Sequence, residues 1–191
     1  GHTAPAPARA RRCAPPGVVC GAGKTPEQLV DIATSLLADH DRLLVTRVSD
    51  AGAGALRTAF PRARFHAASR AVTVEPEDPD PGRGLVVVVS AGTSDGPVAE
   101  EAAVTARLLG SRVEELRDVG VAGLHRLLAH VELLRRARVL VVVAGMEGAL
   151  PSVVGGLVDR PVVAVPSAAG YGAPLGGLAA LLAMLSSCAS G

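Results

Sequence analysis

Residues 85–96 read LVVVVSAGTSDG, an apolar run followed at once by a turn of small and polar residues. Leu85–Ser90 shows no alternation of polar and apolar side chains, which predicts a β-strand buried on both faces. Ala91–Gly96 predicts a turn, and the apolar spacing after it predicts a helix over Pro97–Leu109. A buried strand that leads through a glycine-rich turn into a helix is typical of a parallel α/β sheet.

The rest of the second half of the chain continues this alternation. The expected strands are 112–116, 139–144 and 161–165, and the expected further helices are 124–136, 150–157 and 175–185. Strands that alternate with helices predict an α/β domain of three layers, in which helices cover both faces of a parallel sheet. Ligands bind such sheets at the carboxyl ends of the strands, which directs attention to loops 90–97, 117–123, 144–151, 166–174 and 186–191.

The first half predicts a smaller α/β domain over residues 17–74. Its expected strands are 18–20, 43–48 and 71–74, and its expected helices are 25–40 and 51–60. Thr25, Pro26 and Gln28 have the spacing of a capping box with proline at the first helical position. Residues 1–16 are rich in proline, alanine and arginine and predict a flexible arm. Residues 75–83, EPEDPDPGR, predict a linker, so the second domain is expected over 84–191.

The composition excludes several classes of protein. The 191 residues include only 2% aromatic residues and carry a net charge of +1, which argues against a protein that stacks bases and neutralises nucleic-acid phosphates. No apolar run approaches the ~18–20 residues that span a bilayer. The three cysteines lack metal-binding spacing and are too few for a disulfide framework. Because no signal peptide is visible, we expect a cytoplasmic protein with reduced thiols.

Two glycine-rich turns are candidate anion sites. Ser90, Gly92, Thr93, Ser94 and Asp95 precede an expected helix, whose free backbone N–H groups suit a phosphate or carboxylate; simple capping by Ser94 or Asp95 is the alternative. Gly21–Thr25 reads GAGKT and resembles a P-loop, but Val18 occupies the position of its first glycine. A glycine turn before a capped helix is therefore the preferred interpretation, and Lys24 could still reach a phosphate.

Other residues with chemical potential lie in the remaining loops. Glu147 stands between Gly145, Met146 and Gly148 after an apolar strand, so it is either a surface carboxylate or a general acid or base. His125 lies near an expected helix start and Tyr171 in a glycine-rich loop. Cys188 follows an apolar helix among serines, where a buried thiol and a reactive thiolate are the alternatives. Cys13 and Cys20 are interpreted as incidental.

Three stretches together resemble the LarB family of nickel-pincer nucleotide cofactor biosynthesis. They are SAGTSDGPVAEEAAVTARLLG, RDVGVAGLHRLL and the stretch from VVVAGMEGALPSVVGG to the end, and the resemblance covers residues 84–191. Upstream, GAGKTPEQLVDIATSLL and VTRVS resemble the amino-terminal domain of that family. The resemblance implies a PurE-like, flavodoxin-like carboxyl-terminal domain that is related to aminoimidazole ribonucleotide (AIR) carboxylases and mutases. Family members continue past Cys-Ala-Ser-Gly, so the domain is expected to lack its last strand and helix here.

The resemblance also implies a reaction. Nicotinic acid adenine dinucleotide would be carboxylated by CO2 at a second ring carbon and hydrolysed to pyridinium-3,5-biscarboxylic acid mononucleotide and AMP. Cys188 would be the transient nucleophile and Glu147 would remove the ring proton. Divalent Mg²⁺ and no organic cofactor are implied, together with a homo-oligomer, an octamer in the related enzymes. The expected substrate contacts are Ser90, Gly92, Thr93, Ser94, Asp95, Asp118, His125, Gly145, Met146 and Tyr171, with Lys24 and Arg47 for the phosphates or the adenylate.

Two alternatives remain at this stage. One is an AIR carboxylase or mutase, but those enzymes place a catalytic His-Arg pair where this chain has Gly120 and Val121. The other is a module that binds the dinucleotide without turning it over. Release of AMP together with a carboxylated mononucleotide distinguishes the three hypotheses.

Overall fold

The computed structural model describes residues 17–77, 82–169 and 175–189. The chain divides into two compact units. The first comprises Gly1–Asp80 with Leu108–Gly110, and the second comprises Pro81–Arg107 and Ser111–Gly191. The arm predicted over residues 1–16, residues 78–81 of the predicted linker, and Tyr171 lie outside the described residues. Within the described ranges, no helix combines the length and the apolar character that a bilayer crossing requires.

The amino-terminal unit is a four-stranded sheet with two helices. In chain order its elements are β1 (Gly17–Cys20), α1 (Pro26–Leu37), β2 (Leu43–Thr46), α2 (Asp50–Ala59), β3 (Ala63–His66) and β4 (Ala71–Val74). The strand order is β1-β2-β4-β3, in which β1 and β2 are parallel and the other pairs are antiparallel. Apolar side chains of α1 and α2, including Leu29 and Leu56, share one core with Leu43 and Val72 of the strands.

The capping box predicted at the start of α1 is confirmed. Thr25 Oγ1 accepts a hydrogen bond from Gln28 N, and Gln28 Oε1 accepts one from Thr25 N. Strand β3 was not predicted. Its sequence, ARFH, lacks a β-branched run and forms an edge strand with only partial burial, so tertiary pairing with β4 decides its conformation rather than local preference.

The second unit is a four-stranded parallel sheet. Its elements are β5 (Leu85–Ser90), η2 (Thr93–Asp95), α3 (Gly96–Leu108), β6 (Arg112–Leu116), η3 (Val121–Gly123), α4 (Leu124–Leu128), α5 (Val131–Arg136), β7 (Val139–Ala144), α6 (Leu150–Leu157), β8 (Val162–Pro166), η4 (Leu175–Gly177) and α7 (Leu178–Leu185). The strand order is β6-β5-β7-β8, and every pair is parallel. The predicted α/β fold, a parallel-sheet domain after a smaller α/β region, is confirmed.

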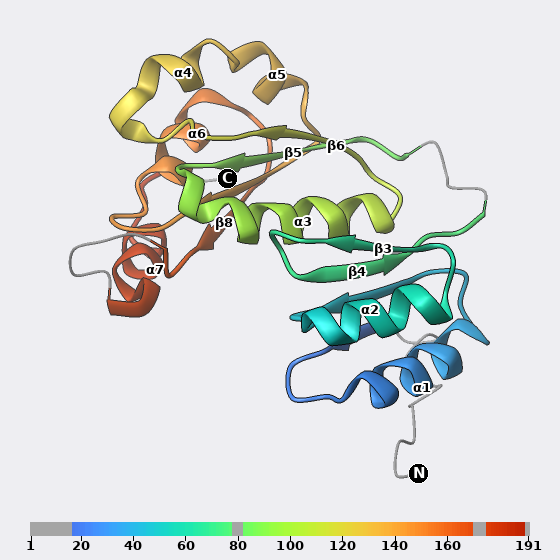
Figure 1. Ribbon diagram of the computed structural model, residues 1–191. Coiled ribbons are helices and arrows are strands. Elements are labelled where there is room, and N and C mark those ends of the chain that lie inside the picture. Colours follow the sequence, from blue (N-terminus) through green and yellow to red (C-terminus); the bar gives the residue numbers. More distant parts are fainter. Residues whose placement is uncertain (1–16, 78–81, 170–174, 190–191) are drawn as a thin grey trace. The chain divides into compact units, whose positions relative to one another are not determined.

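Helices cover both faces of this sheet (Figure 1). On one face, Ala99 and Ala103 of α3 pack on Val88 and Val143. On the other face, Leu127 and Leu134 of α4 and α5, with Leu150 and Val154 of α6, pack on Val87, Val89, Leu140 and Val142. The alternating side chains of β5 and β7 are therefore buried on both sides, as the unbroken valine run predicts.

One predicted helix is divided in the structure. The apolar spacing predicts a continuous helix over residues 124–136, but α4 ends at Leu128 and α5 begins at Val131. His130 has φ −114° and ψ 15°, which lies outside the helical region and interrupts the hydrogen-bond ladder. The apolar residues on either side of this interruption, Leu127 and Leu134, still face the same core.

Candidate functional site

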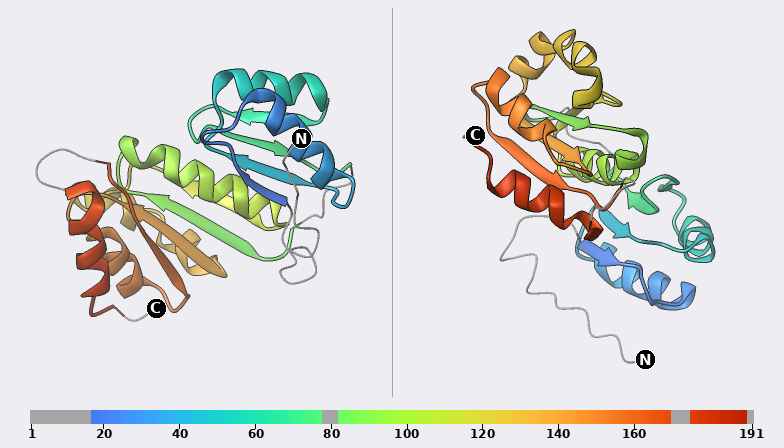
Figure 2. Two further views of the ribbon diagram at one scale, coloured as in Figure 1. Left: turned by 90° about the horizontal axis from the view of Figure 1, so that it is seen from below. Right: turned by 90° about the vertical axis from the view of Figure 1, so that its left-hand side faces the viewer.

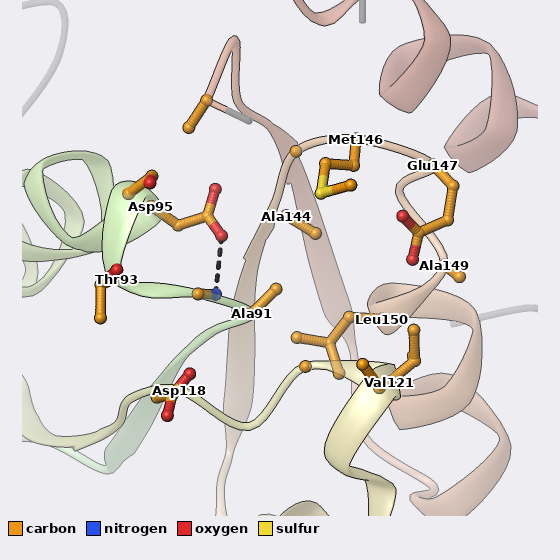
Figure 3. Close-up of a pocket in the computed structure, with 16 residues that line it drawn as sticks. Ala91, Thr93, Asp95, Asp118, Val121, Ala144, Met146, Glu147, Ala149 and Leu150 are labelled. Atoms are coloured by element: carbon orange, nitrogen blue, oxygen red, sulfur yellow. Dashed lines mark hydrogen bonds between the residues drawn. The ribbon is translucent and has the colours of Figure 1, made fainter. Parts of the chain in front are cut away.

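A cavity of about 390 Å³ opens at the carboxyl edge of the parallel sheet. The loops that follow β5, β6 and β7 form its walls, together with Ala169 from the segment after β8 (Figure 3). These loops meet because parallel strands in register end at the same edge: Ser90 of β5 pairs with Val143 of β7, and Ala144 of β7 pairs with Pro166 of β8. The lining residues are Ala91, Gly92, Thr93, Ser94, Asp95, Asp118, Gly120, Val121, Ala122, Ala144, Gly145, Met146, Glu147, Ala149, Leu150 and Ala169.

The buried carboxylate of Asp95 holds the loop after β5 through hydrogen bonds. The residue is only 5% exposed, and its Oδ2 accepts a hydrogen bond from Gly92 N at 2.9 Å (Figure 3). Its Oδ1 accepts a bond from Ser167 Oγ at 2.5 Å, a contact that ties this loop to the segment after β8. Both carboxylate oxygens are thus engaged by the protein. Thr93 and Ser94, by contrast, are exposed at the wall of the cavity and keep their side chains available to a ligand.

The loop after β7 depends on glycine at two positions. A Cβ at Gly145 would overlap the carbonyl oxygen of Ala169. Gly148 has φ +65°, and a Cβ there would lie 2.8 Å from the backbone of Ala180. Met146 also lies in the left-handed region, at φ 53°, which is uncommon for a residue without a short polar side chain. The resulting tight turn holds Glu147 exposed at the cavity wall.

The loop after β6 is fixed to the loop after β5 by backbone hydrogen bonds. Val119 N donates to Ser90 O at 3.2 Å, and Gly120 N donates to Ala91 O at 2.9 Å. A Cβ at Gly120 would lie 2.8 Å from that Ala91 oxygen, so the approach requires glycine. Asp118, with φ 57°, accepts a hydrogen bond from Arg126 Nη1 at 2.5 Å. Asp118 and Glu147 come from different loops and lie on opposite sides of the cavity in Figure 3.

The lining is both apolar and negatively charged. Its ionisable residues are the carboxylates Asp95, Asp118 and Glu147, and no lysine, arginine or histidine is among the described residues that line it. Alanine, valine, leucine and methionine supply most of the remaining surface. An apolar wall with acidic groups favours a ligand that combines apolar surface with positive charge.

Two expected contacts lie elsewhere in the second unit. Ser90 is 1% exposed, does not line the cavity, and its Oγ has no hydrogen-bond partner among the described residues. His125 is exposed on α4 and is likewise outside the lining. The sequence placed both residues near the correct strand ends but could not indicate the direction of their side chains.

Cys188 does not line the cavity that contains Glu147 in the same chain. Cys188 is exposed in the segment after α7, and α7 lies beside β8 (Figure 2). Its neighbours Ser187 and Ala189 line a separate cavity of about 160 Å³ with Val162 and Ala164, near the beginning of β8. Ser187 Oγ also forms a hydrogen bond of 2.7 Å with Ser152 Oγ of α6, whereas the cavity that contains Glu147 takes in Ala149 and Leu150 at the start of that helix. A helix that returns along the sheet after β8 carries Cys188 away from the carboxyl edge, which the motif alone did not reveal.

Lys24 and Arg47 belong to the amino-terminal unit. Lys24 Nζ donates a hydrogen bond to Cys20 O at 2.7 Å, across the turn that the GAGKT sequence forms. Arg47 is exposed and has φ 54°, directly after β2. The lysine therefore closes its own turn, in agreement with the interpretation of a glycine turn before a capped helix.

A preformed metal site is not evident. Within residues 17–77, 82–169 and 175–189, no group of three or more histidine, cysteine, aspartate or glutamate side chains is placed to hold a metal ion. Asp118 is engaged by Arg126, and both oxygens of Asp95 are engaged by Gly92 and Ser167. These donors do not fit a resident Mg²⁺.

Sequence reasoning missed Ser167 and Arg126. Ser167 lies in an expected loop, but nothing in SAAGYG indicates a buried bond to Asp95. Arg126 lies in the stretch RDVGVAGLHRLL, eight residues after Asp118, and is the cation that the structure brings to that carboxylate. The sequence signal for this ion pair was the presence of opposite charges, Asp118 and Arg126, on either side of a glycine-rich turn.

Comparisons with known proteins agree with this architecture. Residues 7–77 match the LarB/PurE-like N-terminal domain, and residues 85–190 match AIR carboxylase. An uncharacterized protein of Methanocaldococcus jannaschii is 46% identical over 110 residues, which cover 56% of this chain and 42% of that relative. The AIR carboxylase match alone takes in more than half of the chain. The chain therefore belongs to the AIR carboxylase family and carries the LarB/PurE-like domain before it, in the order expected of a LarB.

Proposed function

We propose that the protein converts nicotinic acid adenine dinucleotide, CO2 and water to pyridinium-3,5-biscarboxylic acid mononucleotide and AMP. The order of the two domains supports this proposal, because a LarB/PurE-like N-terminal domain precedes a domain of a carboxylase family, in the order expected of a LarB. Family membership supports a carboxylase; the substrate and the hydrolysis are the proposed part.

The cavity suits the nicotinate half of this substrate. A volume of about 390 Å³ is near the lower end for small-molecule sites and fits one nucleotide better than a whole dinucleotide. The pyridinium ring is flat and cationic, so apolar Val121, Met146 and Leu150 can enclose it while the carboxylates favour its charge. Glu147, exposed in the wall, is the proposed acceptor of the ring proton.

The ring chemistry needs a nucleophile. A pyridinium is electron-poor and cannot attack CO2. Addition of a thiolate to the ring forms a carbon–sulfur bond and gives a dihydropyridine, whose enamine carbon attacks CO2. Loss of the proton at that carbon and expulsion of the thiolate restore the aromatic ring. The thiolate is regenerated, so no external oxidant or reductant is required.

Cys188 is the proposed nucleophile, and its position implies a shared site. Because Cys188 does not line the cavity of its own chain, we propose that a homo-oligomer brings the Cys188 of one copy to the Glu147 of another. Mg²⁺ would enter with the pyrophosphate of the substrate rather than occupy a site made by the protein.

A complementation experiment tests this arrangement. Cys188→Ala and Glu147→Gln are each expected to abolish carboxylation. Co-expression of the two variants should restore about a quarter of the wild-type rate, since random assembly leaves that share of shared sites intact. A mixture that stays inactive would contradict the shared site. Full activity of Cys188→Ala alone would contradict the covalent step.

The AIR carboxylase or mutase activity is the second candidate, favoured by the family of the second domain. Gly120 and Val121 line the cavity at the turn where those enzymes carry a His-Arg pair, and they offer no proton-transfer group. His125 is outside the lining. We therefore expect no turnover of AIR or its carboxylated forms. Binding of the dinucleotide with no AMP released would instead support a non-catalytic module.

A further inference from the structure

The cavity lacks a cation for the phosphate of a nucleotide. The described residues that line it include three carboxylates and no basic side chain. The free backbone N–H groups at the starts of α3 and α6 replace the missing cation only in part. Pro97 and Pro151 stand at the second positions of these helices, and each removes one backbone N–H from a first turn. A phosphate dianion would meet net repulsion unless a nearby cation turned toward it.

Arg126 is a cation that contacts the lining of this cavity. Its Nη1 donates to Oδ2 of Asp118 at 2.5 Å, and Asp118 itself lines the cavity. The two side chains remain 44% and 52% exposed, so this ion pair contributes little to folding stability and can exchange partners at small cost. A guanidinium binds phosphate oxygens with two parallel N–H donors, which a single carboxylate oxygen does not use fully.

Gly123 leaves room for this arrangement. A Cβ at Gly123 would lie 2.5 Å from Nε and 2.6 Å from Nη2 of Arg126. The guanidinium thus lies directly over the backbone of η3, whose residues Val121 and Ala122 line the cavity. Because the obstructing atoms belong to the end of a flexible side chain, an alanine at 123 would displace Arg126 without breaking the fold.

We propose that Arg126 binds the phosphate of the nicotinate nucleotide, and that Asp118 and Gly123 hold its guanidinium at the cavity rim for this purpose. Asp118 is then a positioning residue rather than a direct substrate contact. The choice of nucleotide rests on the proposed function; the role of Arg126 as the phosphate cation rests on the charge of the cavity and on the contacts of its side chain.

Equilibrium binding of two probes tests the proposal in the full chain. Nicotinic acid mononucleotide carries the phosphate, and nicotinic acid riboside lacks it. The wild-type protein is expected to bind the mononucleotide about 10- to 100-fold more tightly, the range of a charge-assisted contact. Arg126→Gln and Gly123→Ala should reduce this ratio to near one and leave riboside binding and the melting temperature unchanged. The control Arg160→Gln alters an exposed arginine before β8 and should keep the ratio.

The outcomes separate this inference from the proposed function. An Arg126→Gln variant that keeps the phosphate preference overturns the inference, even where the wild type carboxylates the dinucleotide. Failure of the wild type to bind either probe, or to prefer the mononucleotide, also overturns it. A wild type without turnover whose phosphate preference depends on Arg126 and Gly123 supports the inference and contradicts only the proposed reaction.

Discussion

The two edge strands of the second sheet, β6 and β8, differ in their charge. Strand β6, RVEEL, is charged, and its Glu115 binds Arg107 of α3 at 2.7 Å and Arg117 at 2.6 Å. Strand β8, VVAVP, is uncharged, Val163 is 50% exposed, and no charged residue follows Arg160 in the sequence. Charges on an edge strand discourage pairing with other chains. The β6 edge is therefore suited to water, whereas the β8 side is suited to an apolar contact.

The carboxyl end of β8 is nevertheless held by close contacts with the loops after β5 and β7. Ser167, directly after β8, donates to buried Asp95, and Ala169 approaches Gly145 so closely that only glycine fits there. The cavity lies at this carboxyl end of β8. The later part of α7 and Cys188 are exposed: Leu182 is 55% and Leu185 is 74% accessible.

The largest expected effect on stability is at the carboxyl end of β8. Gly145→Ala forces a methyl group into the Ala169 carbonyl and should lower the free energy of unfolding by about 3 kcal/mol. Urea denaturation measures it. The matched control is Gly156→Ala in α6, where a Cβ meets nothing within 4 Å and should raise stability by about 0.5–1 kcal/mol. Equal stability of the two variants would show that the Gly145 approach does not hold the β8 segment.

The Asp95–Ser167 bond should have the next largest effect. Asp95→Asn and Ser167→Ala are each expected to lower stability by about 2 kcal/mol, because each leaves a buried polar partner with a weaker or missing bond. A double-mutant cycle should give a coupling energy of about 1 kcal/mol. Strictly additive losses would mean that the two loops are stabilised separately.

These two features could not be predicted from the sequence. Apolar runs such as Leu85–Ser90 predict the parallel sheet because burial on both faces imposes a pattern on consecutive residues. The carboxyl-edge loops follow from the same reasoning. The bond from Ser167 to Asp95 spans 72 residues and leaves no periodic signal. The separation of Cys188 from Glu147 likewise depends on the direction in which α7 returns, not on either motif.

The β6 edge predicts a smaller effect that depends on pH. Burial would raise the pKa of Glu115, but hydrogen bonds and charge from Arg107 and Arg117 outweigh it and hold this pKa below its ordinary value. A depressed carboxylate pKa stabilises the fold above the unfolded-state pKa, and the gain is lost as the pH falls through the folded-state pKa. Glu115→Gln should therefore cost about 1 kcal/mol at neutral pH.

Thermal melts across an acid series measure this dependence. The difference between the wild type and Glu115→Gln should be present at neutral pH and shrink below the ordinary pKa of glutamate. A difference that stays constant through the acid range would show that the arginines do not stabilise the ionised form.

The smallest effect on stability is expected at the β8 side. Val163→Lys and Leu182→Lys change exposed side chains and should alter the free energy of unfolding by less than about 0.5 kcal/mol. If copies of the chain meet through this surface, the same variants should lower the molar mass measured by light scattering. Leu128→Lys on α4, where the leucine is 47% exposed, is the control and should leave the mass unchanged. An unchanged mass for all three variants would place the contact elsewhere.

The most direct test of the central claim follows the carbon of CO2. The purified protein is incubated with nicotinic acid adenine dinucleotide and ¹³C-bicarbonate, and the products are resolved by mass spectrometry. We predict AMP and a ¹³C-carboxylated mononucleotide in equal amounts, with no ¹³C-carboxylated mononucleotide formed by Glu147→Gln. Unchanged dinucleotide, or AMP released without ¹³C in the mononucleotide, would contradict the account.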